Sequence, residues 1–132
     1  MKKYIHVVIK ILLTLMLVFP VLGTLGIFPA PTRDLYNTDT AFNFINMLAE
    51  TGYINWIMVI VNIIAVWALW TRREALAGIL IAPVVVNIIA FHAFLDGGLF
   101  TAGAMMANVL LLLTIYLLYK NRHKYFVLLR RE

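Results

Sequence analysis

Four long apolar runs constrain what this chain can fold into more than any other feature. They cover about residues 7–28, 54–71, 75–95 and 102–119. Each run has roughly the 17–25 residues that a helix needs to cross the hydrocarbon core of a bilayer. Lipid offers no hydrogen-bond partner to a free backbone N–H or C=O, so such spans are either helices or strands of a closed barrel. The runs are continuous in Leu, Ile and Val rather than alternating, which favours helices.

The sequence therefore predicts an all-α fold, an integral membrane four-helix bundle in which residues 1–132 form a single four-span domain. Composition agrees with this prediction, because 64% of the residues are hydrophobic and 13% are charged. A soluble domain has about 25% charged residues. The lipid bilayer is thus the expected partner of most of the surface.

The first run has a second interpretation, a cleaved signal peptide. The apolar region of a signal peptide has about 7–15 residues and ends in a small-x-small cleavage site. This run is longer and ends in the sequence Phe28-Pro29-Ala30-Pro31, whose prolines fit such a site poorly. A retained helix is the favoured interpretation.

Basic residues are distributed unevenly between the two ends of the predicted bundle. Ten of the eleven lie on the side of both termini and of the turn at residues 72–73: Lys2, Lys3, Lys10, Arg72, Arg73, Lys120, Arg122, Lys124, Arg130 and Arg131. The other side has Arg33, with Asp34, Asp39, Glu50 and Asp96. By the positive-inside rule, the termini are cytoplasmic. The net charge of +5 fits an anionic leaflet, and no nucleic-acid partner is expected.

The outer connection, residues 29–53, is the longest between two spans. Its two early prolines predict an irregular first half. From Thr38 or Asp39 the chain can form a short amphipathic helix with Phe42 on its apolar side, ended by Gly52. This helix either closes the top of the bundle or covers a ligand site.

Asparagines within the spans are candidate functional residues, because a polar side chain at membrane depth needs a partner or water. Asn62, Asn87 and Asn108 lie at similar expected depths, about 9–12 Å from the outer end at ~1.5 Å per residue. One hypothesis is that they hydrogen-bond to one another across helices. The alternative is a polar cavity that holds water or the head group of an apolar ligand.

His92 and Asp96 form the second candidate site. They are four residues apart, so they share one helix face near the outer surface. A carboxylate beside an imidazole favours its charged form, an arrangement used in proton relays and in quinone recognition. Together with Phe42 and the three asparagines, this pair is the predicted ligand site. The alternative is that His92 is an ordinary interfacial residue.

Cofactor chemistry is limited by the absence of cysteine. The chain itself cannot perform thiol chemistry or hold an iron–sulfur cluster through thiolates. No metal site is expected. A redox role would need a partner protein or a bound cofactor, for which a quinone is the candidate.

Four segments resemble the DoxX-like family of small four-helix bacterial membrane proteins. They are residues 28–37 (FPAPTRDLYN), 42–53, 82–87 (APVVVN) and 91–96 (FHAFLD). The resemblance implies a bacterial inner-membrane protein, an accessory or anchor subunit of a redox or stress-response complex. It implies a protein partner and no established catalytic residues, so whether the chain is an enzyme stays open. The alternatives are a small transporter or channel, for which a homo-oligomer is one arrangement, or an assembly protein without a ligand.

Overall fold

The computed structural model describes residues 1–130, and all regular structure in this part of the chain is helical. Four long helices dominate: α1 (Lys2–Thr24), α3 (Tyr53–Trp70), α4 (Glu74–Phe94) and α5 (Ala102–Lys120). The shorter elements are η1 (Arg33–Leu35), α2 (Asp39–Thr51), α6 (Arg122–Phe126) and η2 (Val127–Leu129). All four long helices have the length and hydropathy to cross a membrane, which confirms the predicted fold class.

Helix ends follow local sequence signals. Helix α1 ends at Thr24 rather than at Phe28, because Gly26 takes a left-handed conformation with φ of 77° just beyond it. Thr38 caps α2 by accepting a hydrogen bond from the Ala41 N–H at 3.1 Å. Gly52, with φ of 70°, separates α2 from α3. The predicted amphipathic helix in the outer connection is therefore present.

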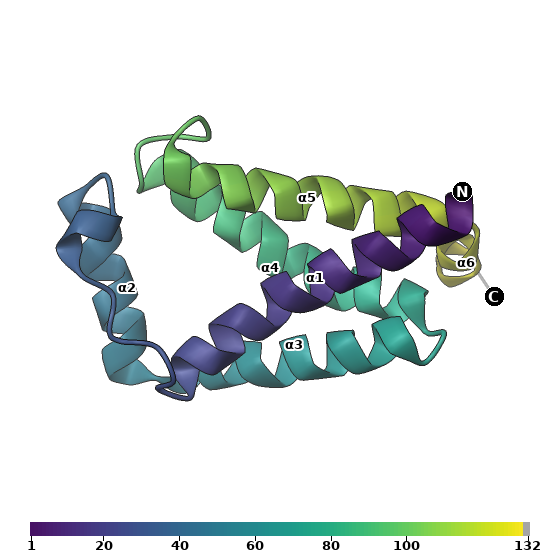
Figure 1. The fold of residues 1–132 in the computed structure, drawn as a ribbon, viewed down its shortest axis with the longest axis horizontal. Helices are drawn as coiled ribbons and strands as arrows, with labels where there is room; N and C mark the ends of the chain where they lie inside the picture. Colours follow the sequence, from purple (N-terminus) through teal and green to yellow (C-terminus); the bar gives the residue numbers. More distant parts are fainter. Residues whose placement is uncertain (131–132) are drawn as a thin grey trace.

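The long helices form an up-and-down bundle with one diagonal member (Figure 1). Helix α4 packs against both α3 and α5. Helix α1 crosses obliquely, from the C-terminal end of α5 to the N-terminal end of α3. Helix α1 therefore diverges from α5 over its second half. Helix α2 lies across that end of the bundle and packs on α3.

Small and branched apolar residues make up the bundle core. Its buried members are Leu13 and Leu17 of α1, Ala65, Ala68 and Leu69 of α3, Ala77, Ile81 and Val85 of α4, and Leu110 and Leu117 of α5. The alanines allow the helix backbones to approach closely, as small residues do in membrane bundles. Large apolar residues such as Ile60, Ile63 and Leu112 are instead exposed on the outside. An apolar exterior is what contact with lipid requires.

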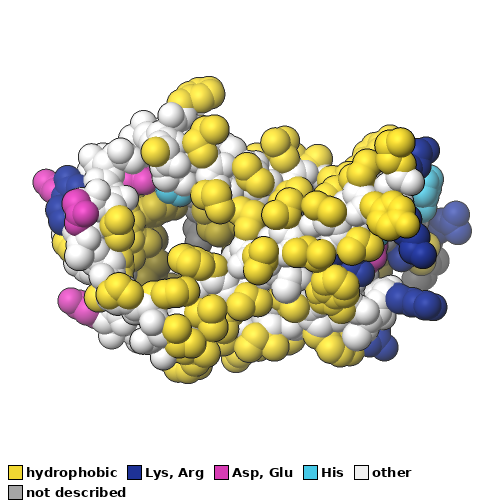
Figure 2. Space-filling view, viewed as in Figure 1, with side chains coloured by type: hydrophobic (Ala, Val, Ile, Leu, Met, Phe, Trp, Pro, Cys, Tyr) yellow, Lys and Arg dark blue, Asp and Glu magenta, His cyan; other side chains and the backbone are white. Residues whose placement is uncertain are grey.

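Charged side chains gather at the two ends of the bundle (Figure 2). Lysines and arginines surround the start of α1, the α3–α4 turn and the end of α5, which we call the basic end. The opposite end, which we call the loop end, consists of residues 25–52 and 95–101. The assignment of the basic end to the cytoplasm stays a prediction.

Helix α6 was not predicted from the sequence. It folds back against α4, where the Tyr125 hydroxyl donates a hydrogen bond to the Ala75 carbonyl at 3.0 Å. Gly78 permits this contact, since a Cβ atom at Gly78 would lie 2.7 Å from the Tyr125 hydroxyl oxygen. The Gly78 position thus serves packing within the chain.

Candidate functional site at the loop end

Asp96 is the centre of a hydrogen-bonded cluster at the loop end. Asp96 comes shortly after Phe94, the last residue of α4, and is almost fully buried, with 1% of the residue exposed. One carboxylate oxygen, Oδ1, accepts the Asn37 backbone N–H at 2.8 Å. The other, Oδ2, lies 3.0 Å from His92 Nδ1, within hydrogen-bond distance. A buried carboxylate is tolerated where both oxygens find such partners.

Residues 37 and 38 form a second set of bonds with the end of α4. The Asn37 side-chain amide donates to the Asp96 carbonyl at 3.1 Å, and the Thr38 hydroxyl donates to the Leu95 carbonyl. Gly97 follows with φ of 85°, and a Cβ atom there would lie 3.3 Å from Asn37 Cβ. The outer connection is therefore fastened to the α4–α5 turn by side chains and backbone together.

The start of α5 completes this cluster. Gly103 packs closely against His92 and Asp96. A Cβ atom at Gly103 would be 3.5 Å from His92 Cε1 and 3.7 Å from Asp96 Oδ2. The Asn108 side chain donates to the Leu99 carbonyl at 2.7 Å and so holds the α4–α5 turn. Asn108 has a structural partner in the loop rather than in another helix.

A group of aromatic rings adjoins His92. The Phe91 ring lies 5.2 Å from the His92 ring, 5.9 Å from that of Phe44 and 6.4 Å from that of Tyr36, measured between centroids. Tyr36 in turn packs on Phe42 at 5.9 Å. Burial raises the pKa of the Tyr36 phenol, and the nearby charge of Asp96 raises it further. Phe42 and His92 therefore belong to one cluster, joined through Tyr36 and Phe91.

A cavity of about 400 Å³ lies beneath α2, beside this cluster. Its walls come from the end of α1, the proline-containing loop, α2 and the start of α3: Phe19, Pro20, Gly23, Thr24, Phe28, Pro29, Ala30, Pro31, Tyr36, Ile45, Leu48, Ala49 and Asn55. Residues of the amphipathic helix thus form one wall of this cavity, and whether it covers a ligand is taken up below. His92, Asp96 and Phe42 are not among the lining residues. Tyr36 is the residue that connects the cluster to the cavity.

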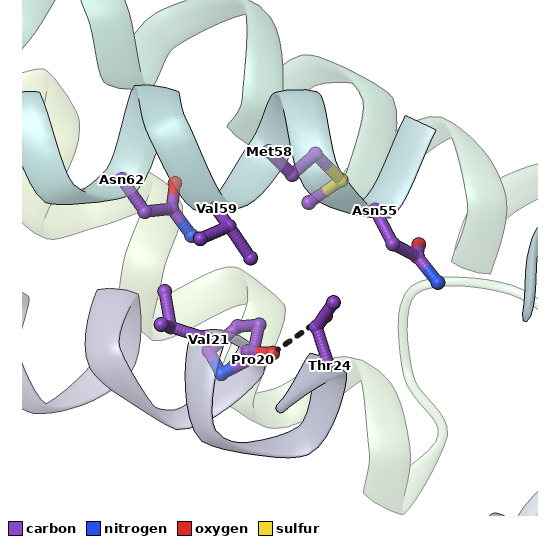
Figure 3. A pocket seen from close by; sticks show the side chains of 7 residues that line it. All are labelled: Pro20, Val21, Thr24, Asn55, Met58, Val59 and Asn62. Atoms are coloured by element: carbon purple, nitrogen blue, oxygen red, sulfur yellow. Dashed lines mark hydrogen bonds between the residues drawn. The ribbon is translucent and has the colours of Figure 1, made fainter. Parts of the chain in front are cut away.

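Asn62 lies elsewhere, in the seam between α1 and α3 (Figure 3). Its side-chain N–H donates to the Leu17 carbonyl at 3.1 Å, while its Oδ1 is buried without a partner in the described part of the chain. A cavity of about 40 Å³ adjoins it, and Figure 3 shows the lining side chains of α1 and α3 on opposite sides of the gap. A cavity needs at least about 10–15 Å³ of accessible volume to hold one water, so this space can hold water beside Asn62.

Asn87 is exposed on the outside of α4. Val85 is almost fully buried, and a residue two positions later points about 200° away around the helix.

The prediction that Asn62, Asn87 and Asn108 hydrogen-bond to one another is wrong. Asn62 and Asn108 donate to backbone carbonyls, and no bond joins any two of the three within residues 1–130. Equal depth does not fix the direction in which a helix side chain points.

Asn37 and Tyr36 were not predicted from the sequence as site residues. The sequence around Asn37 signals only a turn before a helix, and its bonding partner is 59 positions away. Among residues 1–130, no group of three or more His, Asp or Glu side chains is placed to hold a metal ion.

Comparison of the chain with protein-family models, curated proteins and solved structures finds no match.

Proposed function

We propose that this chain is a DoxX-like protein of the bacterial inner membrane and that it holds a quinone or lipid beneath α2. In this proposal it acts as an accessory or anchor subunit of a redox or stress-response complex. The observation that supports ligand binding is the cavity of about 400 Å³ at the loop end. Sites for small molecules have volumes of about 300–1,000 Å³ and mostly apolar walls with a few polar groups. This cavity matches both properties.

Access from the membrane supports a lipid-soluble ligand. A groove of about 440 Å³ lies between the diverging halves of α1 and α5 and is lined by Leu15, Met16, Phe19, Pro20 and Met106. Phe19 and Pro20 also line the cavity beneath α2. The two spaces therefore adjoin, and the groove opens on the apolar exterior. A ligand dissolved in the bilayer could reach the cavity sideways without crossing water.

Three polar side chains in the wall can orient such a ligand. Tyr36 and Asn55 each offer a donor, and a quinone carbonyl or a lipid ester accepts hydrogen bonds. The Thr24 hydroxyl already donates to the Pro20 carbonyl at 3.1 Å, so it can only accept from a ligand. The Asn55 amide makes a long contact of 3.4 Å with the Leu48 carbonyl, which a ligand could replace. In this proposal His92 and Asp96 position the loop that presents Tyr36, and they do not contact the ligand.

The redox or stress-response setting rests on the resemblance of residues 28–37, 42–53, 82–87 and 91–96 to the DoxX-like family. The chain has no cysteine, so a partner or the bound ligand would supply the electron chemistry. The exposed apolar surface of the helices leaves room for a partner in the same membrane.

Purification in mild detergent followed by mass spectrometry of bound small molecules and proteins tests the proposal. We expect the wild-type chain to retain a quinone or a lipid, and Ala49→Phe to lose it, because the added ring would fill the cavity from its α2 wall. Ala102→Phe is the matched control, since Ala102 is exposed and does not line the cavity. Equal ligand content in the wild-type chain and both variants would rule out this site.

A further inference from the structure

A second large cavity lies at the basic end, between the start of α1 and the end of α5. It has a volume of about 620 Å³ and is lined by Lys2, Lys3, Ile5, His6, Tyr116 and Lys120. Nothing in the proposed function uses it, and the two sites are at opposite ends of the bundle. Three lysines around one cavity concentrate positive charge at this site.

Helical spacing brings these cations together. Lys2 and Lys3 precede His6 by four and three residues, so all three lie on one face of α1. Lys120 approaches from α5, with its Nζ 2.6 Å from His6 Nε2. The two helices that meet here separate farther along the bundle, so the cavity lies where α1 and α5 are joined (Figure 1).

One carboxylate in this region, Glu74, is already engaged. Its Oε1 lies 2.8 Å from His6 Nε2 and 3.5 Å from Lys10 Nζ, and its Oε2 lies 3.3 Å from Lys120 Nζ. Four lysines (2, 3, 10 and 120) against one glutamate leave a net charge of +3 with His6 neutral. Lys2 and Lys3 are exposed and form no ion pair with any residue up to 130. The local positive charge is therefore only partly compensated.

His6 provides a further indication of a missing partner. Its Nδ1 atom is buried and has no hydrogen-bond partner among residues 1–130. A buried polar atom without a partner costs roughly 1–3 kcal/mol. The ring that carries this unpaired nitrogen is itself part of the cavity wall.

Apolar side chains distinguish this cavity from an ordinary patch of surface lysines. Ile5 and Tyr116 form part of its wall, and the neighbouring Tyr4 and Val8 are 76% and 53% exposed on the same stretch of α1. Figure 2 shows the lysines and arginines of this end bordering directly on the apolar exterior. A ligand seated here would have its anionic part among the lysines and an apolar part along the helices.

We propose that this cavity binds the phosphate of an anionic lipid head group, with the acyl chains lying against α1 and α5. Basic pockets between membrane helices bind such head groups on the cytoplasmic side, where the positive-inside rule places this end. Inorganic phosphate shares the charge but would gain nothing from Ile5 and Tyr116. The apolar wall therefore favours a lipid.

Native mass spectrometry of the full chain in detergent, with equal amounts of phosphatidylglycerol and phosphatidylcholine, tests this proposal. We expect phosphatidylglycerol to be retained preferentially by the wild-type chain. In the variant K2Q/K3Q/K120Q its retention should fall on the order of tenfold or more, since each lysine near a membrane surface contributes about 1 kcal/mol. The control R72Q/K124Q/R130Q removes the same charge from the same end but leaves the cavity intact, and should retain the lipid.

Three results would overturn the proposal. They are equal loss of lipid in the two triple variants, equal retention of the two lipids by the wild-type chain, and a thermal stabilisation by inorganic phosphate as large as that by phosphatidylglycerol. The variant K2Q/K3Q preserves the contact of Lys120 with Glu74. If the triple variant does not fold, this double variant should still show reduced retention of phosphatidylglycerol. Ala49→Phe should leave the preference for phosphatidylglycerol over phosphatidylcholine unchanged, because the lysines that would set this preference line only the cavity at the basic end. This readout separates the test from that of the cavity beneath α2.

Discussion

Asn37 and Asp96 are joined by two hydrogen bonds, although 59 positions separate them in the chain. The Asn37 backbone N–H donates to Asp96 Oδ1 at 2.8 Å, and the Asn37 side chain donates to the Asp96 carbonyl at 3.1 Å. The pair fastens the loop that follows α1 to the turn that follows α4. It thereby fixes Tyr36, the neighbour of Asn37, in the wall of the proposed ligand cavity.

Asp96→Leu is expected to destabilise the loop end. The change removes the charged acceptor of the part-buried Asn37 N–H, and a hydrogen bond to a charged group contributes about 1.5–3 kcal/mol. Asp96→Asn should be milder, because the amide oxygen can still accept from Asn37. Thermal unfolding in detergent would compare the two variants, and equal losses of stability would contradict the assigned role of Oδ1.

His92→Ala separates a positioning role from direct ligand contact. His92 does not line the cavity, so we expect ligand content close to that of the wild-type chain with a lower melting temperature. Direct contact with the ligand would instead weaken binding by about 1–3 kcal/mol, the cost of an unsatisfied partner. Quantification of bound quinone or lipid at matched expression distinguishes the two outcomes.

Replacement by leucine should affect stability differently at Asn108 and at Asn87. Asn108→Leu removes the bond to the Leu99 carbonyl and is expected to lower stability by about 1 kcal/mol. Asn87→Leu replaces an exposed polar side chain on a membrane helix by an apolar one, so stability should be unchanged or higher. Unfolding in lipid nanodiscs provides the measurement. A clear loss of stability for Asn87→Leu would mean that Asn87 has a partner.

Gly78→Ala should disturb the packing of α6 on α4. The new methyl group would lie 2.7 Å from the Tyr125 hydroxyl oxygen and 3.0 Å from Leu118 Cδ2, and overpacking of this kind costs about 1–3 kcal/mol. Adding Tyr125→Phe makes room and should restore part of the stability. Gly23→Ala is the control, because a Cβ atom there meets nothing within 4 Å. A double variant no more stable than Gly78→Ala alone would argue against this contact.

The predicted orientation can be tested with topology reporters. Reporters placed after Glu132 and between Arg72 and Arg73 should both indicate the cytoplasm, because ten of the eleven basic residues lie at that end. Opposite answers from the two positions would be incompatible with four spans.

Local signals in the sequence determined the helices. The span of α3 could be predicted because most of its side chains are apolar and independently favour lipid or the bundle core. Helix α2 could be predicted from its cap at Thr38 and its end at Gly52. These signals act over a few residues. The gathering of charge at one end of the bundle is likewise a property of the order of residues along the chain.

Tertiary structure alone decided which residues meet. Helix rotation placed Asn62 in the α1–α3 seam and Asn87 outside, although hydropathy gives both the same depth. The oblique path of α1 created the groove beside α5, and the bond between Asn37 and Asp96 closed the loop end. Such contacts depend on the relative rotation and crossing of whole helices, which is set by the packing of all their side chains together and has no signal in any single segment.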